Sequence, residues 1–311
     1  MTGRNKGYAV VVGCANVDIG GKPFAPLVER DSNPGAVRIS YGGVGRNIAH
    51  DLALLGVRVY MLTALGRDGF SDGLLDNCLR AGIDMSHAAR YADEQTSAYV
   101  FVADPDGDMR VAVCDARISQ RIDEGYLKEN LPLLNAASAV AIDGNLSPAA
   151  IDFVTRSCTA PIFADPVSVG KALKLKPVLP RIFSIKPNVY EAERLSGLRI
   201  TDRPSLSAAA ARLLEAGTER VYISMGAQGL FCAGEGRELL VPPCAARMVN
   251  ATGGGDAAMA MLVRAHMDGL PMERAARLAA AAGSIAVESE AAVNTDMCME
   301  RILARAQEKE N

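Results

Sequence analysis

The stretch VNATGGGDAAMAML, residues 249–262, places three consecutive glycines and one aspartate directly before a run of helix-forming residues. Ala, Met, Leu and Arg dominate residues 256–266, so this segment predicts a helix with the glycines at its N-terminus. The first amides of a helix have no partner within the helix and lie at the positive end of its dipole. Bare glycine backbone lets an anion approach those amides, so the turn is a candidate phosphate or oxyanion site.

Asp256 stands directly behind Gly253, Gly254 and Gly255. A carboxylate repels an anion, so its place beside an anion site needs a reason. In one interpretation Asp256 is a base that takes a proton from an incoming hydroxyl, while the amides hold the phosphoryl group being transferred. In the other, Asp256 is the N-cap of its helix and the glycines form an ordinary loop, because Asp is a favoured N-cap residue. The motif alone leaves both open.

The composition indicates a large globular chain and argues against several classes of function. Its 311 residues are 49% hydrophobic with a net charge of −3, which favours neither a nucleic acid nor an anionic membrane as partner. The apolar run that ends at Gly13 is too short for a signal peptide or a membrane span. The seven cysteines include no Cys-x-x-Cys pair and the three histidines no metal-spaced pair. We therefore expect a cytoplasmic protein with reduced thiols.

Apolar runs alternate with helical patterns along most of the chain. The runs typical of buried strands are residues 8–13, 57–62, 137–143, 161–166, 181–186 and 220–225. Helical patterns separate them, and two of these, residues 45–56 and 70–82, end at a glycine. Such alternation predicts a single α/β domain over residues 1–311, with a mostly parallel sheet covered by helices on both faces.

Two regions interrupt this pattern. Residues 17–42 are short, polar pieces punctuated by Gly and Pro, and residues 96–115 read as a hairpin around the turn DPDGD. One interpretation pairs them in a small antiparallel sheet that forms a lid over the strand ends. The alternative makes them ordinary surface loops. If they form a sheet, its exposed edges could be covered by a second copy, giving a homodimer through the lid.

Common nucleotide and hydrolase motifs are missing. The sequence after the first strand fails the G-x-G-x-x-G fingerprint, which disfavours an NAD-dependent oxidoreductase, and no P-loop or G-x-S-x-G elbow occurs. Polar residues instead follow the predicted strands, where ligands bind in open α/β sheets. Short amides and one carboxylate suit a polyhydroxylated ligand. Taken singly, Asn47 and Asn188 could equally be helix caps.

Five segments resemble the PfkB, or ribokinase-like, family of carbohydrate and nucleoside kinases, and the resemblance covers nearly the whole chain. They are YGGVGRNIAHDLALLG, LTALGRDGFSDGLLDNCLRAGID, KPNVYEAE, SMGAQGL and NATGGGDAAMAM. The resemblance implies a ribokinase-like fold with a β lid, and ATP-dependent phosphorylation of a hydroxyl with Mg²⁺. It makes Asp256 the catalytic base and the glycines the anion hole. Gly254 stands where the family more often has alanine.

The same resemblance assigns the other site residues. Those implied to hold the substrate are Asn16, Asp18, Gly42, Gly43, Asn47 and Asn145. Those implied to line the nucleotide are Asn188, Ser224, Gly226, Gly229 and Thr252. Glu191 would organise Mg²⁺ through water. Some members of the family need a monovalent cation, and because residues 286–296 do not match that loop closely, potassium dependence stays open.

Within the family, four segments are most similar to pseudouridine kinases. They are residues 33–56, 104–118, 140–151 and 287–294. This resemblance implies phosphorylation of the 5′-hydroxyl of pseudouridine, whose extra N–H donor could meet Thr96, Ser97, Asp115 or a backbone carbonyl. The alternatives are kinases for ribose, fructose, adenosine, inosine or cytidine. A binding or regulatory protein without turnover is disfavoured by the intact Asp256 and glycine triplet.

Overall fold

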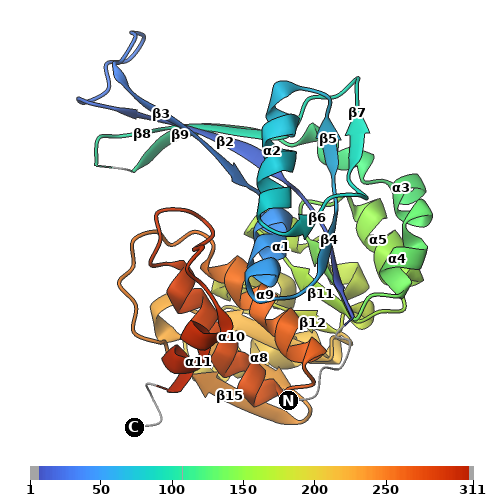
Figure 1. Cartoon of the computed structure of the whole chain (residues 1–311). Coiled ribbons are helices and arrows are strands. Elements are labelled where there is room, and N and C mark those ends of the chain that lie inside the picture. The colour runs from blue at the N-terminus through green and yellow to red at the C-terminus, as the bar shows by residue number, and fades with distance from the viewer. Residues whose placement is uncertain (1–6, 107, 308–311) are drawn as a thin grey trace.

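The computed structural model describes residues 7–106 and 108–307 and is built on a nine-stranded central sheet (Figure 1). The strand order is β15-β14-β13-β12-β11-β10-β1-β4-β6. The parallel strands are β1 (Ala9–Val12), β4 (Val59–Leu62), β6 (Ile83–Asp84), β10 (Ala139–Asp143), β11 (Ile162–Asp165), β12 (Ser184–Ile185) and β13 (Arg220–Ser224). At one edge, β14 (Leu230–Gly234) and β15 (Arg237–Val241) run antiparallel. The predicted mostly parallel sheet is confirmed.

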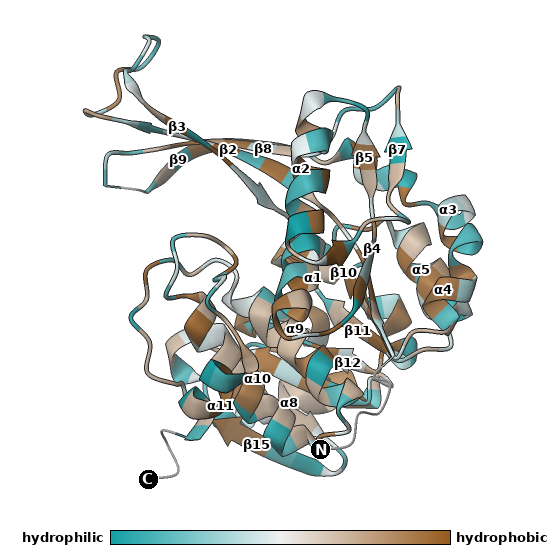
Figure 2. Ribbon diagram, in the orientation of Figure 1, coloured by the Kyte–Doolittle hydropathy of each residue, from teal (hydrophilic) through white to brown (hydrophobic). Residues whose placement is uncertain are grey.

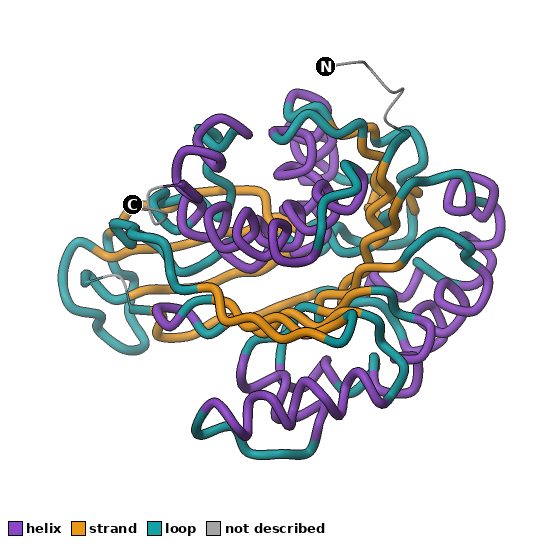
Figure 3. Tube along the Cα trace, turned by 90° about the horizontal axis from the view of Figure 1, so that it is seen from below, coloured by secondary structure: helices purple, strands orange, loops and turns teal. Residues whose placement is uncertain are grey.

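Helices cover both faces of this sheet (Figure 3). One face carries α1 (Val44–Leu54), α2 (Gly69–Arg80), α9 (Gly254–Met267), α10 (Met272–Ala286) and α11 (Met299–Gln307). The other carries α3 (Glu124–Glu129), α4 (Leu131–Asn135), α5 (Pro148–Ser157), α6 (Val169–Ala172), α7 (Val189–Ser196) and α8 (Arg203–Glu215). Strand β1 supplies both cores, because Ala9 and Val11 point to the first face and Val10 and Val12 to the second. Figure 2 shows the hydrophobic colouring of the central strands.

Short elements complete the central body. Strands β5 (Ala64–Gly66) and β7 (Ala89–Tyr91) form a separate parallel pair. The 3-10 helices are η1 (Arg117–Arg121), η2 (Lys176–Arg181) and η3 (Gly226–Gln228). Across residues 7–106 and 108–307, no helix is both long and apolar enough to span a membrane.

A second sheet projects from one side of the body (Figure 1). This outer sheet consists of β2 (Asn16–Pro23), β3 (Gly35–Gly42), β8 (Ala98–Ala103) and β9 (Met109–Asp115), in the order β3-β2-β8-β9. The two regions that interrupt the αβ pattern are therefore strands of one sheet rather than surface loops. The expectation of a wholly antiparallel sheet is wrong, because β2 and β8 pair in parallel and thereby join two antiparallel hairpins.

Candidate active site

Asp256 lies inside the first turn of α9, as the third residue of the helix. The helix begins at Gly254, two residues earlier than predicted, and its N-cap is Gly253. The interpretation of Asp256 as an N-cap is therefore wrong. Its buried carboxylate accepts a hydrogen bond of 2.9 Å from Nδ2 of Asn47. Burial and the nearby charge of Asp165 raise the pKa of Asp256 to about 7. A carboxyl group with this pKa can exchange a proton near neutral pH, as a general base must.

Different contacts favour glycine at Gly253 and at Gly255. Gly253 has a left-handed backbone with φ of 88°, and a Cβ there would overlap the carbonyl oxygen of Ala292. Gly255 packs against another side chain, since a Cβ there would lie 3.2 Å from Nζ of Lys186. Among the described residues no side chain caps α9, so the amides of its first turn have no partner within the helix.

The predicted substrate residues at the start of β2 and α1 come together in space. Nδ2 of Asn16 donates to Oδ1 of Asp18 at 2.5 Å. A Cβ on Gly42 would overlap Oδ2 of Asp18, and one on Gly43 would lie 2.8 Å from Oδ1 of Asn16. Burial raises the pKa of Asp18 to about 6, although Arg46 acts in the opposite direction. The Gly42–Gly43 turn leads into α1, whose Asn47 connects this group to Asp256.

Asn145 lies two residues after the end of β10 and is linked through Asp143 to the turn before β2. Its Oδ1 accepts a hydrogen bond of 2.5 Å from Nζ of Lys171, and its backbone amide donates to Oδ1 of Asp143. The other oxygen of Asp143 accepts from the amides of Cys14 and Gly45, both at 2.9 Å. This fully buried carboxylate therefore ties the end of β10 to the turn before β2 and to the start of α1. Sequence reasoning missed Asp143 because it read as the last residue of a strand.

Asn188 and Glu191 form a reciprocal capping box at the start of α7. Oδ1 of Asn188 accepts from the amide of Glu191 at 2.9 Å, and Oε2 of Glu191 accepts from the amide of Asn188 at 2.8 Å. The capping role that the sequence left open for Asn188 is thus realised. Ser224 forms an isolated bridge with Asn188, which brings the next predicted nucleotide residue beside it.

The remaining predicted nucleotide residues lie in two turns. Gly226 and Gly229 both have positive φ and form the turn after β13, which is closed by the amide of Met225 donating to the Gly229 carbonyl at 2.9 Å. Thr252 is exposed, and its amide donates to Oδ1 of Asn250 at 2.9 Å. In the described part of the chain, no group of three or more His, Cys, Asp or Glu side chains could hold a metal ion. Glu191 therefore fits Mg²⁺ only with water or phosphate oxygens as further ligands.

Two charged residues that sequence reasoning missed lie beside the anion site. Nζ of Lys186 and Oδ2 of Asp165 form a buried ion pair of 3.1 Å. The charge of Asp165 also contributes, after burial, to the raised pKa values of Asp256 and Glu191. Asp165 ends β11, and Lys186 directly follows β12. Ligands bind at such strand ends in open α/β sheets, so this position could have indicated both residues as site residues.

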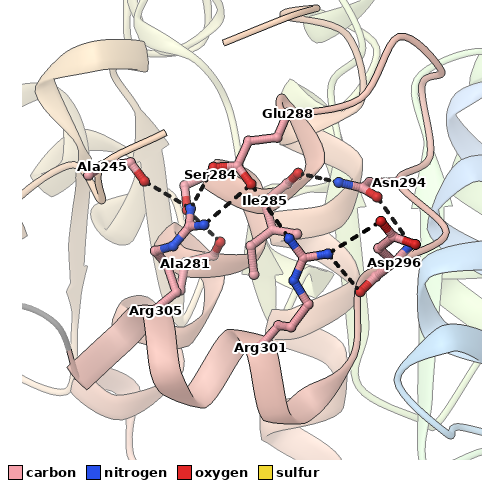
Figure 4. Close-up of polar contacts among 9 residues, drawn as sticks. All are labelled: Ala245, Ala281, Ser284, Ile285, Glu288, Asn294, Asp296, Arg301 and Arg305. Atoms are coloured by element: carbon pink, nitrogen blue, oxygen red, sulfur yellow. Dashed lines mark hydrogen bonds and ion pairs between the residues drawn. The ribbon is translucent and has the colours of Figure 1, made fainter. Parts of the chain in front are cut away.

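A polar network joins α11 to the loop after α10 and to the backbone of Ala245 (Figure 4). Arg305 of α11 donates to the carbonyl of Ala245 at 2.8 Å and pairs with Glu288 at 3.1 Å. The same loop carries Ala292, whose carbonyl packs against Gly253. Helix α11 thus holds both the segment of Ala245 and the loop after α10. The second of these packs against the glycine turn through Ala292.

Comparisons with known proteins agree with this geometry. A family model described as pfkB family carbohydrate kinase matches residues 6–297. The chain is 34% identical over 309 residues to the pseudouridine kinase of Escherichia coli (strain K12), with 99% of each chain covered. It is 33% identical over 299 residues to the uncharacterized sugar kinase YeiI of the same organism, covering 96% of this chain and 83% of that one.

Solved structures show the same fold. The ribokinase of Arabidopsis thaliana, complexed with ribose and ATP, superposes with a TM-score of 0.86 at 23% identity, covering 97% of this chain and 99% of that one. The family model and the 34% identity to the Escherichia coli relative show that the chain belongs to the pfkB family of carbohydrate kinases. It is a ribokinase-like phosphotransferase that acts on a hydroxyl group of a sugar or nucleoside.

Proposed function

We propose that this kinase transfers the γ-phosphoryl group of ATP to the 5′-hydroxyl of pseudouridine. One observation carries the choice of a nucleoside over a free sugar. Two aromatic side chains, Tyr99 and Phe101, share a face of the outer sheet with Asp18. A ligand whose ribose hydroxyls bind Asp18 would therefore find a surface for a flat base directly beside it.

Strand register places these aromatic rings. Asp18 of β2 lies opposite Tyr99 of β8, and Gly20 lies opposite Phe101. Alternation along each strand puts all four residues on one face. The bare Gly20 lets the ring of Phe101 lie over the neighbouring strand, because a Cβ there would be 2.5 Å from Cζ of Phe101. The two ring centroids are 5.8 Å apart and their planes are inclined by 38°. Stacking of bases on such rings is a common mode of recognition.

The catalytic roles follow from the groups around α9. Asp256 takes the proton of the 5′-hydroxyl, and the amides of the glycine turn stabilise the negative charge on the transferring group. Mg²⁺, held through water by Glu191 and by the ATP phosphates, would offset the remaining charge, with Asn188 and Ser224 beside the nucleotide. The outer sheet would act as a lid that keeps water from competing for the phosphoryl group. Potassium dependence stays open.

The contacts of the three candidate base-reading residues differ. Oγ1 of Thr96 accepts from the amide of Gly66 at 3.0 Å and donates to Asp68 at 2.9 Å, so it is already engaged. Asp115 lies opposite Ala98, on the face away from Asp18, and pairs with Arg117. The acceptor for the extra N–H of pseudouridine is therefore assigned to Ser97 or to backbone carbonyls. The 34% identity with the Escherichia coli pseudouridine kinase supports pseudouridine as the substrate.

The test is steady-state kinetics with pseudouridine, uridine, ribose and adenosine. We expect the highest kcat/KM with pseudouridine, since a site that pairs its extra donor rejects the analogue that lacks it. Replacing Tyr99 and Phe101 by Leu should lower kcat/KM for pseudouridine by about 10-fold or more, the usual range for loss of base stacking. The same variants should change kcat/KM for ribose little. A preference of the wild type for ribose or adenosine would contradict the substrate assignment while leaving kinase activity in place.

We further propose that the opposite face of the outer sheet binds a second copy of the chain. That face carries a set of apolar side chains that are 44% to 71% exposed: Val37, Ile39, Val100, Val111 and Val113. Contiguous exposed apolar residues of this kind mark interaction surfaces. A two-fold axis would bring the same apolar patch of two chains together, which is the commonest arrangement of homodimers.

Sedimentation velocity tests the dimer. We expect the wild type to sediment as a dimer and Val113→Asp as a monomer, because a charge in the buried centre of the contact is left without a partner. Lys22→Asp is the matched control, since it places the same charge on the other face of the sheet. A monomeric wild type, or a dimeric Val113→Asp variant, would remove this surface from the interface.

A further inference from the structure

The third glycine of the turn leaves room for a buried ammonium group. Lys186 follows β12, and its Nζ reaches the first turn of α9, where a Cβ on Gly255 would lie 3.2 Å away. The ammonium forms an ion pair of 3.1 Å with Asp165, and the two side chains are only 4% and 8% exposed. The end of β12 therefore places an ammonium group, paired with Asp165 of β11, at the same helix N-terminus that presents the free amides.

The surrounding charges keep this amine protonated. Burial alone would lower the pKa of Lys186, but the charges of Asp165, Glu191 and Asp256 raise it above its ordinary value. The ammonium thus lies among three carboxyl groups that would otherwise repel the phosphates of ATP. It has three N–H donors, of which the ion pair with Asp165 engages one. The others are available to a ligand.

We propose that Lys186 is a further catalytic residue, whose ammonium contacts the phosphoryl group during transfer from the side of Gly255. This rests on the phosphotransferase activity of the family and not on which nucleoside or sugar is the acceptor. In the step, a bond forms between the acceptor oxygen and the γ-phosphorus. The bond from that phosphorus to the β,γ-bridging oxygen breaks, and ADP leaves with its electron pair. The hydroxyl proton passes to Asp256, while Lys186 and the amides stabilise the charge on the equatorial oxygens.

Lys186→Met tests the contact, because Met keeps the length of the side chain and removes its charge. We expect kcat to fall about 10²-fold or more, as for loss of one preorganised donor, with the KM of the acceptor nearly unchanged. Lys176→Met is the matched control, since Lys176 is exposed on η2. It should retain wild-type kcat.

A binding measurement separates this role from a structural one. Aluminium fluoride with MgADP and the acceptor mimics the transferring phosphoryl group, and we expect it to tighten ADP binding about 10-fold or more in the wild type. Lys186→Met should bind MgADP normally but show no such tightening. If that variant does not fold, Lys186→Gln removes the same charge with a polar side chain and should show the same loss. Wild-type kcat and full tightening in either folded variant would overturn the proposal. Absence of activity toward nucleosides alone would contradict only the proposed substrate.

Discussion

Replacement of Asp256 by Asn is expected to lower kcat by about 10²-fold or more, with little change in the KM of the acceptor. Asn has nearly the same shape and can still contact Asn47, but it cannot take the proton of the attacking hydroxyl. Steady-state rates at saturating ATP measure the effect. Turnover close to that of the wild type would show that Asp256 is not the base.

The pH dependence of the two proteins provides a control. Because the pKa of Asp256 is raised to about 7, wild-type kcat/KM should fall as the pH decreases below this value and the carboxylate becomes protonated. The residual activity of Asp256→Asn should lack the fall near pH 7 and keep only one near pH 6, where Asp18 becomes protonated.

The stability of the wild type should fall as the pH rises, whereas its activity should increase. The pKa of Asp256 is raised on folding, so its contribution to stability is full below the ordinary value of 3.8 and is lost as the pH rises through about 7. The variant has no carboxyl group to ionise, so at pH 8 its Tm should exceed that of the wild type. This result would also show that the inactive variant is folded.

Replacement of Gly253 by Ala is expected to destabilise the protein by about 3 kcal/mol or more and to abolish most activity. A side chain at φ of 88° is strained, and the new methyl group would overlap the backbone oxygen of Ala292, which cannot rotate away as a side chain can. The glycine turn and the loop after α10 would have to separate. Thermal unfolding measures the loss of stability, and the KM of ATP measures the damage to the anion site.

Gly254→Ala is the matched control for this variant. Gly254 lies within α9, and a Cβ there would lie 3.0 Å from Cγ1 of Val287, a methyl group that a rotation of the side chain can move. We expect a change in stability within about 1 kcal/mol and retained activity. Equal losses in the two variants would show that the conformation of Gly253 has no special importance.

Much of the fold could be predicted because its cause is local. Alternation of apolar runs with helical patterns requires helices on both faces of a parallel sheet, and that is what the structure has. Pairing between distant strands has no such local cause. The segment that forms β8 reads as part of a hairpin and the segment that forms β2 as short polar pieces, and nothing in either shows that the two would join in parallel.

Part of the candidate site could likewise be predicted from local sequence, and part could not. Gly253 to Asp256 stand next to one another in the sequence, so the chemistry of bare amides and a carboxylate could be deduced from residue types. Whether Asp256 caps the helix or lies inside it depends on the backbone of Gly253, which residue types do not determine. Asp165 ends β11 and Lys186 directly follows β12, and only the register of the sheet brings their charges together.

The parallel pairing of β2 with β8 also sets an order of assembly during translation. The hairpin of β2 and β3 is complete once residue 42 has emerged, but the inner edge of β2 has no neighbour until Ala98–Ala103 follows. At the usual rates of synthesis this interval lasts roughly 3 to 12 seconds. During that time the nascent chain presents an unpaired strand edge together with the apolar side chains of Val37 and Ile39, which is the combination that holdase chaperones and aggregation both select.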